Sequence, residues 1–283
     1  MSRTVYVNGQ FVPENEAQIS VFDRGFLFAD GVYEVCSVLK GKLLETEGHV
    51  ARLHRSMNEL DIEAPCSDEE LLAAMEKLVA DNNIEEGLVY LQVTRGAADR
   101  DFAYPKDAKS TLVMFTQVKA LLDNPIADKG VSVVTLPDLR WARRDIKTVG
   151  LLYPCMAKME AKSRGADDAW MLDEDGFVTE GTSNNAYIVT EDNVIVTRHI
   201  SNSILNGITR RSVLALAEEL DMKIEQRPFT PEEAYAAKEA FFTSASAFTM
   251  PVVKIDDAVL GDGTPGEITK KLRQKYIDLS LSL

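Results

Sequence analysis

Alternation of apolar and polar residues with a period of two predicts strands along much of the first half of this chain. Residues 4–12 alternate around Asn8-Gly9, which is the strongest short signal for a β-hairpin. A second alternating run, 31–39, puts Tyr33 and Val35 on the same face of a strand. Further strands are expected over 42–44, 88–94 and 111–118.

Helical spacing of apolar residues predicts two helices between these strands. The first runs over about 47–60, and the second follows Ser67-Asp-Glu-Glu70, the pattern of a capping box at a helix N-terminus. The pattern lapses over 119–130, so a linker is expected there. We therefore expect an N-terminal α+β domain over 1–118 and a C-terminal domain over 131–283.

The second half mixes β-branched runs with helical patterns, which favours a mixed domain of strands and helices. Its first strand is expected over 131–136, and a helix over 154–164 ends at Gly165. Asn206-Gly-Ile-Thr209 opens another helix, over 210–220. Other strands are expected over 169–172, 177–180, 185–189, 194–197 and 241–246, with one more near Ile224.

Composition narrows the possible function classes. The 283 residues carry a net charge of −14, and such a chain lacks the electropositive footprint that nucleic-acid binding needs. Cys36, Cys66 and Cys155 are far apart and odd in number, so neither a disulfide framework nor a zinc site is indicated. No HExxH, P-loop or dinucleotide motif occurs, and no apolar run reaches the roughly 20 residues of a membrane-spanning helix. We expect a cytoplasmic protein that binds no metal.

A basic cluster follows the strand expected over 131–136. Arg140, Arg143, Arg144 and Lys147 fall within eight residues, and crowding of like charge favours the neutral amine that forms a Schiff base. A lysine in such a cluster is also commonly a solvated surface group, because lysine is rarely buried. The pattern alone leaves both interpretations of Lys147 open.

Three features suit a phosphorylated aromatic cofactor. Gly207-Ile208-Thr209 opens a predicted helix, where free N–H groups and the helix dipole favour a phosphate, although an ordinary helix cap has the same pattern. Glu180 ends a predicted strand before a run of small polar residues, where it could pair with a pyridinium nitrogen or simply face solvent. Arg52 could bind a phosphate through two hydrogen bonds or be a surface arginine.

Several segments together resemble the class IV aminotransferases, the pyridoxal-phosphate enzymes of fold type IV. They are Asp23–Glu34, His49–Leu53, Val93–Gly96, Asp145–Lys147, Val178–Gly181, Asn185, Leu205–Arg210 and Thr243–Ser246. The similarity runs from Tyr6 to about Tyr276 without a long gap, and it is strongest to the bacterial D-amino-acid aminotransferases. It implies a smaller N-terminal α+β domain and a larger C-terminal domain with a mixed, barrel-like β-sheet and helices.

The resemblance also implies roles for individual residues. Lys147 would form the Schiff base with pyridoxal 5'-phosphate and move the proton to and from the substrate Cα, while Glu180 would keep the pyridine nitrogen protonated. Further cofactor contacts would come from Arg52, Ser183, Asn184, Leu205, Gly207, Ile208, Thr209, Ser244, Ala245 and Ser246. The substrate would meet Tyr33, Val35, Ser246 and Arg100, the last of these supplied by the partner subunit of a homodimer.

The reaction implied is transfer of the amino group of a D-amino acid, such as D-alanine or D-glutamate, to a 2-oxo acid such as 2-oxoglutarate. The pairing of Tyr33 with Arg100 favours this over a branched-chain L-amino-acid aminotransferase, which shares the lysine, the glutamate and the phosphate site. An aminodeoxychorismate lyase has the same fold and a different reaction. A non-enzymatic acidic binding protein is the remaining alternative.

The chain departs from the family at one position of the substrate loop. D-amino-acid aminotransferases usually have a histidine two positions after the loop arginine, where this chain has Phe102. One donor is lost, and Asp101 adds a like charge beside the expected carboxylate site. We expect weaker carboxylate binding and a substrate range broadened towards (R)-configured primary amines.

Overall fold

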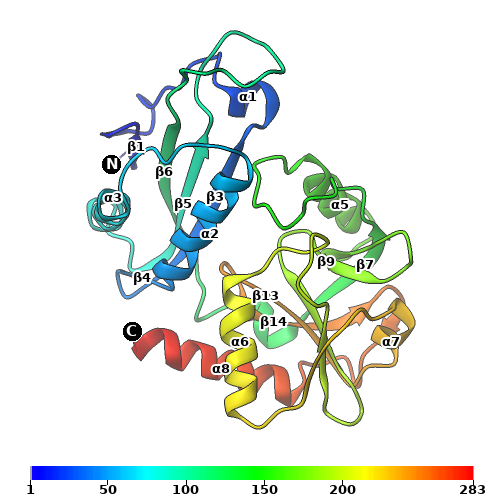
Figure 1. Ribbon diagram of the computed structural model, residues 1–283. Helices are drawn as coiled ribbons and strands as arrows, with labels where there is room; N and C mark the ends of the chain where they lie inside the picture. The colour runs from blue at the N-terminus through cyan, green and yellow to red at the C-terminus, as the bar shows by residue number, and fades with distance from the viewer. Residues whose placement is uncertain (1, 283) are drawn as a thin grey trace. The chain divides into compact units, whose positions relative to one another are not determined.

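The structure is a computed structural model that describes residues 2–282 and divides them into two units (Figure 1). Unit 1 contains the described residues up to Ala120 together with Ile146–Gly150. Unit 2 contains Leu121–Asp145 and the described residues from Leu151 onwards. Lys147 therefore belongs to unit 1, whereas the division expected from the sequence put it in a domain that starts at residue 131.

Unit 1 is built on a six-stranded antiparallel sheet with the strand order β2-β1-β6-β5-β3-β4. Its elements are β1 (Thr4–Val7), β2 (Gln10–Pro13), α1 (Arg24–Phe28), β3 (Gly31–Leu39), β4 (Lys42–Leu43), α2 (Thr46–Glu59), α3 (Asp68–Asp81), β5 (Glu86–Thr94) and β6 (Thr111–Val118). Asn8 and Gly9 join β1 to β2 with φ angles of 46° and 90°, the left-handed pair that a two-residue hairpin requires. The hairpin expected from the sequence is confirmed.

One apolar cluster joins the sheet of unit 1 to its helices. Val32 and Cys36 of β3 pack with Leu53 of α2 and Leu78 of α3. Successive side chains of a strand point to opposite faces, so the intervening Tyr33 lies on the other face of β3, where it is half-buried. The face of β3 away from the core is thus the one that carries the expected substrate residues.

Unit 2 contains a nine-stranded mixed sheet in which β12-β11-β10-β13-β14-β7-β8-β9 are neighbours and β15 pairs with β14. Its strands are β7 (Val131–Pro137), β8 (Asp168–Leu172), β9 (Val178–Gly181), β10 (Asn185–Val189), β11 (Ile195–Thr197), β12 (Ile224–Gln226), β13 (Glu239–Ser244), β14 (Phe248–Ile255) and β15 (Ala258–Val259). Its helices are α4 (Pro125–Lys129), α5 (Leu152–Ser163), α6 (Ile208–Glu219), α7 (Pro231–Tyr235) and α8 (Glu267–Ser282). The pairs β7·β8, β7·β14 and β11·β12 are parallel, and the others are antiparallel.

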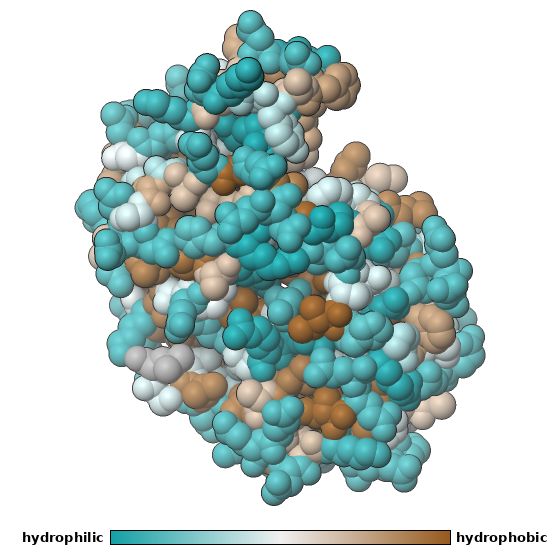
Figure 2. Space-filling model, in the orientation of Figure 1, coloured by the Kyte–Doolittle hydropathy of each residue, from teal (hydrophilic) through white to brown (hydrophobic). Residues whose placement is uncertain are grey.

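A buried apolar core fixes the strands of unit 2. Trp170 of β8 meets Phe229 edge-on at 6.0 Å between ring centroids, and Tyr187 of β10 stacks on Phe241 of β13 at 4.5 Å. Polar residues cover most of the face that Figure 2 shows, in keeping with the charge of the chain. No helix within residues 2–282 combines the length and the apolar character needed to span a membrane.

Candidate active site

Lys147 is held by the sheet of unit 1. Its carbonyl oxygen accepts a hydrogen bond from Tyr33 N at 3.0 Å, and its N–H donates to Ser56 Oγ of α2 at 3.3 Å. Its Nζ lies 4.1 Å from the centroid of the Tyr33 ring, within the range of a cation–π contact. Lys147 was expected in a basic cluster that follows the strand over 131–136. β7 ends at Pro137, and the backbone that fixes Lys147 is that of β3.

Tyr33 belongs to a row of stacked rings across the sheet. Its ring stacks on Tyr90 of β5 at 5.6 Å, and Tyr90 stacks on Phe115 of β6 at 4.7 Å. Burial raises the pKa of Tyr90 to about 12, and its hydroxyl donates to Gln92 Oε1. The row fixes the position of the Tyr33 ring beside Lys147, and Val35, which is two residues further along β3, shares the same face.

Arg52 belongs to a buried cluster of charged side chains on β3 and α2. Glu34 is fully buried, and its Oε1 and Oε2 accept hydrogen bonds from Arg52 Nε and Nη2, both at 2.7 Å. Its Oε2 also lies 2.7 Å from His49 Nδ1. Burial alone would raise the pKa of Glu34, but Arg52 and His49 outweigh it and lower this pKa to about 2. Glu34 occupies the Nε and Nη2 edge of Arg52, so a phosphate would meet another edge of the guanidinium.

Arg100 lies in the exposed loop between β5 and β6. Its Cζ is 5.2 Å from the Phe28 ring centroid and 5.5 Å from that of Phe102, and the two rings are 5.7 Å apart. The Asp101 side chain is engaged within the loop, because its Oδ1 accepts a backbone N–H two residues on. Its carbonyl oxygen accepts from Arg24 Nη1 of α1 at 2.6 Å. The guanidinium of Arg100 therefore rests against two aromatic rings.

Glu180 is buried near the end of β9, and its carboxylate accepts three hydrogen bonds. Arg140 Nη1 donates to Oε1 at 2.5 Å, while Asn185 Nδ2 and the Leu205 N–H donate to Oε2 at 2.9 and 3.1 Å. Burial raises the pKa of Glu180, and Arg140 and the Leu205 N–H act against this rise. Oε1 has a lone pair left for a further donor.

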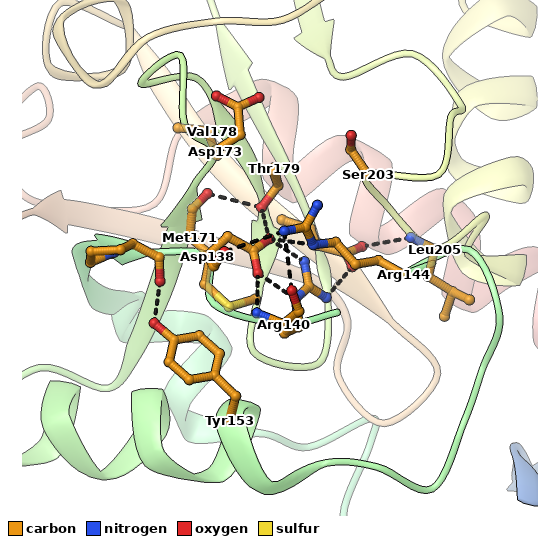
Figure 3. Close-up of polar contacts among 12 residues, drawn as sticks. Asp138, Arg140, Arg144, Tyr153, Met171, Asp173, Val178, Thr179, Ser203 and Leu205 are labelled. Atoms are coloured by element: carbon orange, nitrogen blue, oxygen red, sulfur yellow. Dashed lines mark hydrogen bonds and ion pairs between the residues drawn. The ribbon is translucent and has the colours of Figure 1, made fainter. Parts of the chain in front are cut away.

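A buried aspartate directly after β7 holds Arg140 in place. Asp138 Oδ1 accepts from Arg140 Nε at 2.9 Å, and Oδ2 accepts from Arg140 Nη2 at 2.7 Å. Thr179 Oγ1 donates to the same Oδ2 at 2.7 Å, and Arg144 Nε lies 3.1 Å from it. Figure 3 shows these side chains gathered around Asp138. Burial opposes the charge of Arg140, but Glu180 and Asp138 raise the pKa of Arg140, so it stays cationic.

The N-terminus of α6, in the same unit, offers donors to an anion. The helix begins at Ile208, and its N-cap, Gly207, has no side chain to accept the first helical N–H groups. Thr209 is buried, and its hydroxyl has no hydrogen-bond partner. A Cβ at Gly207 would lie 2.2 Å from Asn185 Oδ1, so glycine is required there. A buried hydroxyl without a partner beside free N–H groups is an environment that a phosphate satisfies.

The other expected residues of unit 2 fall into two groups. Ser244 ends β13, Ala245 and Ser246 lie in the turn that leads to β14, and Leu205 reaches Glu180 through its N–H. Asn184 instead donates to Asp168 Oδ2 at 2.8 Å, and Ser183 is exposed. The structure thus brings Leu205 and Gly207 together with Glu180 around Asn185, while Asn184 is tied to β8.

Comparison with known proteins identifies the family. The family model for class IV amino-transferases matches residues 31–255. D-alanine aminotransferase from Bacillus licheniformis is 40% identical, over 95% of this chain and 94% of that protein. The same enzyme from Staphylococcus aureus (strain MSSA476) is 39% identical, over 97% of this chain and 98% of that protein. The chain belongs to the class IV aminotransferases.

A solved structure agrees with this assignment. The T.th. branched-chain amino acid aminotransferase with pyridoxamine 5'-phosphate matches with a TM-score of 0.91 and 28% identity, over 100% of this chain and 95% of that chain. The fold type and the enzyme class implied by the sequence are confirmed: the protein is a class IV aminotransferase, and these enzymes use pyridoxal 5'-phosphate. The residues present fit that cofactor, since Glu180 offers a buried carboxylate and the start of α6 offers an unpaired hydroxyl and N–H groups.

The basic cluster of this aminotransferase has a different environment from the expected one. Arg140 and Arg144 contact Asp138, and Arg143 pairs with Asp145 at 3.0 Å. Carboxylates therefore offset the arginine charges, and crowding of like charge does not distinguish Lys147. Asp138 was not among the expected site residues, although a charged residue directly after a buried β-branched run was an available signal.

Replacing Glu34 with glutamine should destabilise this aminotransferase. The change leaves Arg52 and His49 without a buried counter-charge, and breaking a buried pair costs about 3–5 kcal/mol of the free energy of unfolding. The folded-state pKa of Glu34 is about 2 and its ordinary value is 4.5, so the stabilisation is complete above pH 4.5 and is lost as the pH falls towards 2. Denaturant unfolding at several acidic pH values measures both effects.

The matched control is Glu63→Gln, which changes an exposed glutamate of the same unit. It should leave the free energy of unfolding within about 0.5 kcal/mol of the native value. Equal stability of the two variants would contradict the assignment of Glu34 as the counter-charge of Arg52.

Proposed function

We propose that this aminotransferase transfers the amino group of a D-amino acid, such as D-alanine or D-glutamate, to a 2-oxo acid such as 2-oxoglutarate. The observation that carries the proposal is the 39 to 40% identity to two D-alanine aminotransferases over nearly the whole chain. The branched-chain enzyme with pyridoxamine 5'-phosphate has the same fold at 28% identity. Transamination of branched-chain L-amino acids is therefore the second candidate.

Lys147 is the residue that we assign to proton transfer. Bound pyridoxal 5'-phosphate supplies an electron sink that makes the substrate Cα–H acidic. The Lys147 amine then takes the proton from Cα and returns it, as a positioned general base and acid. Its backbone is tied to Tyr33 and Ser56, so the side chain moves while its origin stays fixed.

The other assigned residues would bind and orient the cofactor. Glu180, which Arg140 and the Leu205 N–H hold in place, would accept a hydrogen bond from the protonated pyridine nitrogen, and Leu205 would pack beside the ring. The phosphate would be held by Gly207, Ile208, Thr209, the turn Ser244-Ala245-Ser246 and Arg52, and Ser183 and Asn184 would lie beside the cofactor. The hydroxyl of Thr209, which has no partner of its own, supports this assignment most directly.

In this proposal Tyr33 and Arg100 bind the substrate carboxylate, and Val35 and Ser246 contact the substrate. Arg100 is supplied by the partner subunit of a homodimer. The position of Arg100 supports its proposed role, because Arg100 lies in an exposed loop and its guanidinium rests on Phe28 and Phe102. We further propose that the enzyme works in the cytoplasm. Its cysteines at 36, 66 and 155 are free thiols, as suits a reducing compartment.

A donor and acceptor screen tests the proposed function. D-alanine with 2-oxoglutarate should give pyruvate and D-glutamate. L-leucine and L-alanine should react at least roughly 10²-fold more slowly, because the wrong enantiomer leaves the polar groups of Tyr33 and Arg100 unpaired. Faster turnover of L-leucine would establish the branched-chain alternative. Pyruvate released from aminodeoxychorismate without any acceptor would establish the lyase.

The environment of Phe102 leads to a second prediction on substrates. Phe102 supplies an apolar ring where a histidine would donate a hydrogen bond to the carboxylate, so (R)-1-phenylethylamine should be accepted, more slowly than D-alanine. Phe102→His should shift the preference towards D-alanine by about tenfold, the value of one hydrogen bond to a charged group. Initial rates with both donors measure this, and complete refusal of the amine by the native enzyme would contradict it.

A further inference from the structure

Arg140, in the arginine cluster after β7, contacts the buried carboxylate of Glu180. We propose that Arg140, held by Asp138, is a positioning residue that keeps the Glu180 carboxylate ionised and oriented, so that the pyridine nitrogen of the cofactor retains its proton. The inference rests on the proposed function, because it takes Glu180 as the partner of that nitrogen.

The guanidinium of Arg140 bridges the carboxylates of Asp138 and Glu180, and we call this arrangement the clamp. Its Nε and Nη2 are both used by Asp138, at 2.9 and 2.7 Å, and its Nη1 reaches Glu180 Oε1. A guanidinium is planar, so it cannot turn away from Glu180 without breaking both hydrogen bonds to Asp138. Asp138 is itself fixed by Thr179 and Arg144 (Figure 3). The direction of Nη1 is therefore set by the neighbours of Asp138.

The charges around Glu180 favour the same conclusion. Asp138, on the same segment as Arg140, acts to raise the pKa of Glu180, as burial does. Arg210 of α6 attracts Glu180 at longer range, but its Nη2 donates to Arg198 O and Gln226 Oε1. Arg140 is the cation that donates a hydrogen bond to this carboxylate.

Arg140 decides where a proton shared between Glu180 and the pyridine nitrogen lies. Transfer of that proton to Glu180 would leave Arg140 facing a neutral acid in a buried site, which costs free energy. The proton therefore stays on the nitrogen. Without Arg140, burial would favour a neutral acid beside a neutral ring, and the ring would withdraw electrons less strongly.

The test uses holoenzymes reconstituted with pyridoxal 5'-phosphate labelled with nitrogen-15 in the ring. The nitrogen-15 NMR signal reports protonation of that nitrogen from neutral to alkaline pH. The native enzyme should keep the proton throughout, and Arg140→Gln should lose it as the pH rises. The kcat of Arg140→Gln should fall by roughly 10²-fold, as for loss of one preorganised electrostatic contact. KM for D-alanine should stay within about twofold, because substrate binding is not touched.

Further variants separate positioning from a general structural role. Arg140→Lys restores the charge without the planar fork, so it should recover part of the nitrogen signal and of kcat. Arg143→Gln, in the same segment but paired with Asp145, should behave as the native enzyme. In the background of Glu180→Gln, the change Arg140→Gln should have no further effect on the nitrogen signal.

Several results would overturn the inference. A native nitrogen signal and native kcat in Arg140→Gln would do so, and so would an equal effect of Arg140→Gln with and without Glu180. If Arg140→Gln does not fold, a fully native Arg140→Lys decides against the clamp and a partial loss supports it. A protonated nitrogen in Glu180→Gln would instead remove Glu180 as the partner, which is a failure of the proposed site and not of the clamp alone.

Discussion

Lys147→Ala should leave the protein folded and abolish transamination. The amine is the group assigned to proton transfer at the substrate Cα, and alanine has no replacement for it, so kcat should fall by roughly 10⁴-fold, the upper end for a positioned acid–base group. The fold should persist because the contacts of Lys147 with Tyr33 N and Ser56 Oγ are made by its backbone. The lost contact with the Tyr33 ring is worth only about 0.5–1 kcal/mol.

Two measurements check the role of Lys147. The first is the rate of pyruvate formation from D-alanine and 2-oxoglutarate, together with thermal unfolding of the variant. The second is borohydride reduction of the native holoenzyme followed by peptide mapping, which should find the pyridoxyl group on Lys147. Lys271→Ala, in an exposed position of α8, is the control and should keep native activity. Near-native turnover by Lys147→Ala would remove the central assignment.

Local features of the fold were predictable from the sequence because neighbouring residues determine them. Asn8 and Gly9 adopt the left-handed conformations of a tight hairpin, which few other dipeptides allow. Ser67 caps α3, with its Oγ accepting the Glu70 N–H and the Glu70 carboxylate accepting the Ser67 N–H. In both cases the interacting groups are at most three residues apart, so tertiary packing was not needed to recognise them.

The pairings of the site depend on contacts that are distant along the chain. Lys147 is fixed by Ser56, 91 residues away, and Glu180 meets Arg140 across 40 residues. A strand pattern gives no information on which buried charge will face another. Lys147 was therefore recognised from its family motif, while Asp138 and the counter-charge role of Glu34 became visible only once the chain was folded.

Most residues of the candidate site were predicted from the family motifs. Gly207 shows why such a motif can be read physically: a Cβ there would collide with Asn185, which holds Glu180. Glycine at this position therefore leaves room for the Asn185 side chain that contacts Glu180, in addition to beginning the helix. The same residue type in an ordinary helix cap would be tolerated for its flexibility alone.

Glu180→Gln should retain the cofactor but slow proton abstraction. Glutamine has nearly the same shape, and its side-chain oxygen can still accept the hydrogen bonds from Asn185 and the Leu205 N–H. It carries no negative charge, so the pyridine nitrogen would lose the partner that we propose keeps it protonated. We expect the rate of the half-reaction with D-alanine to fall by roughly 10²–10³-fold, the effect of removing one preorganised electrostatic group.

Stopped-flow absorbance of the single half-reaction separates this effect from product release, and equilibrium titration of the apoenzyme measures cofactor affinity. Glu174→Gln, in the exposed turn between β8 and β9, makes the same chemical change away from the site and should leave both quantities native. Because the lost interaction acts on the transition state more than on binding, the rate should change far more than the affinity. A native rate in Glu180→Gln, or a loss confined to cofactor affinity, would mean that the carboxylate holds the ring without acting on its electronic state.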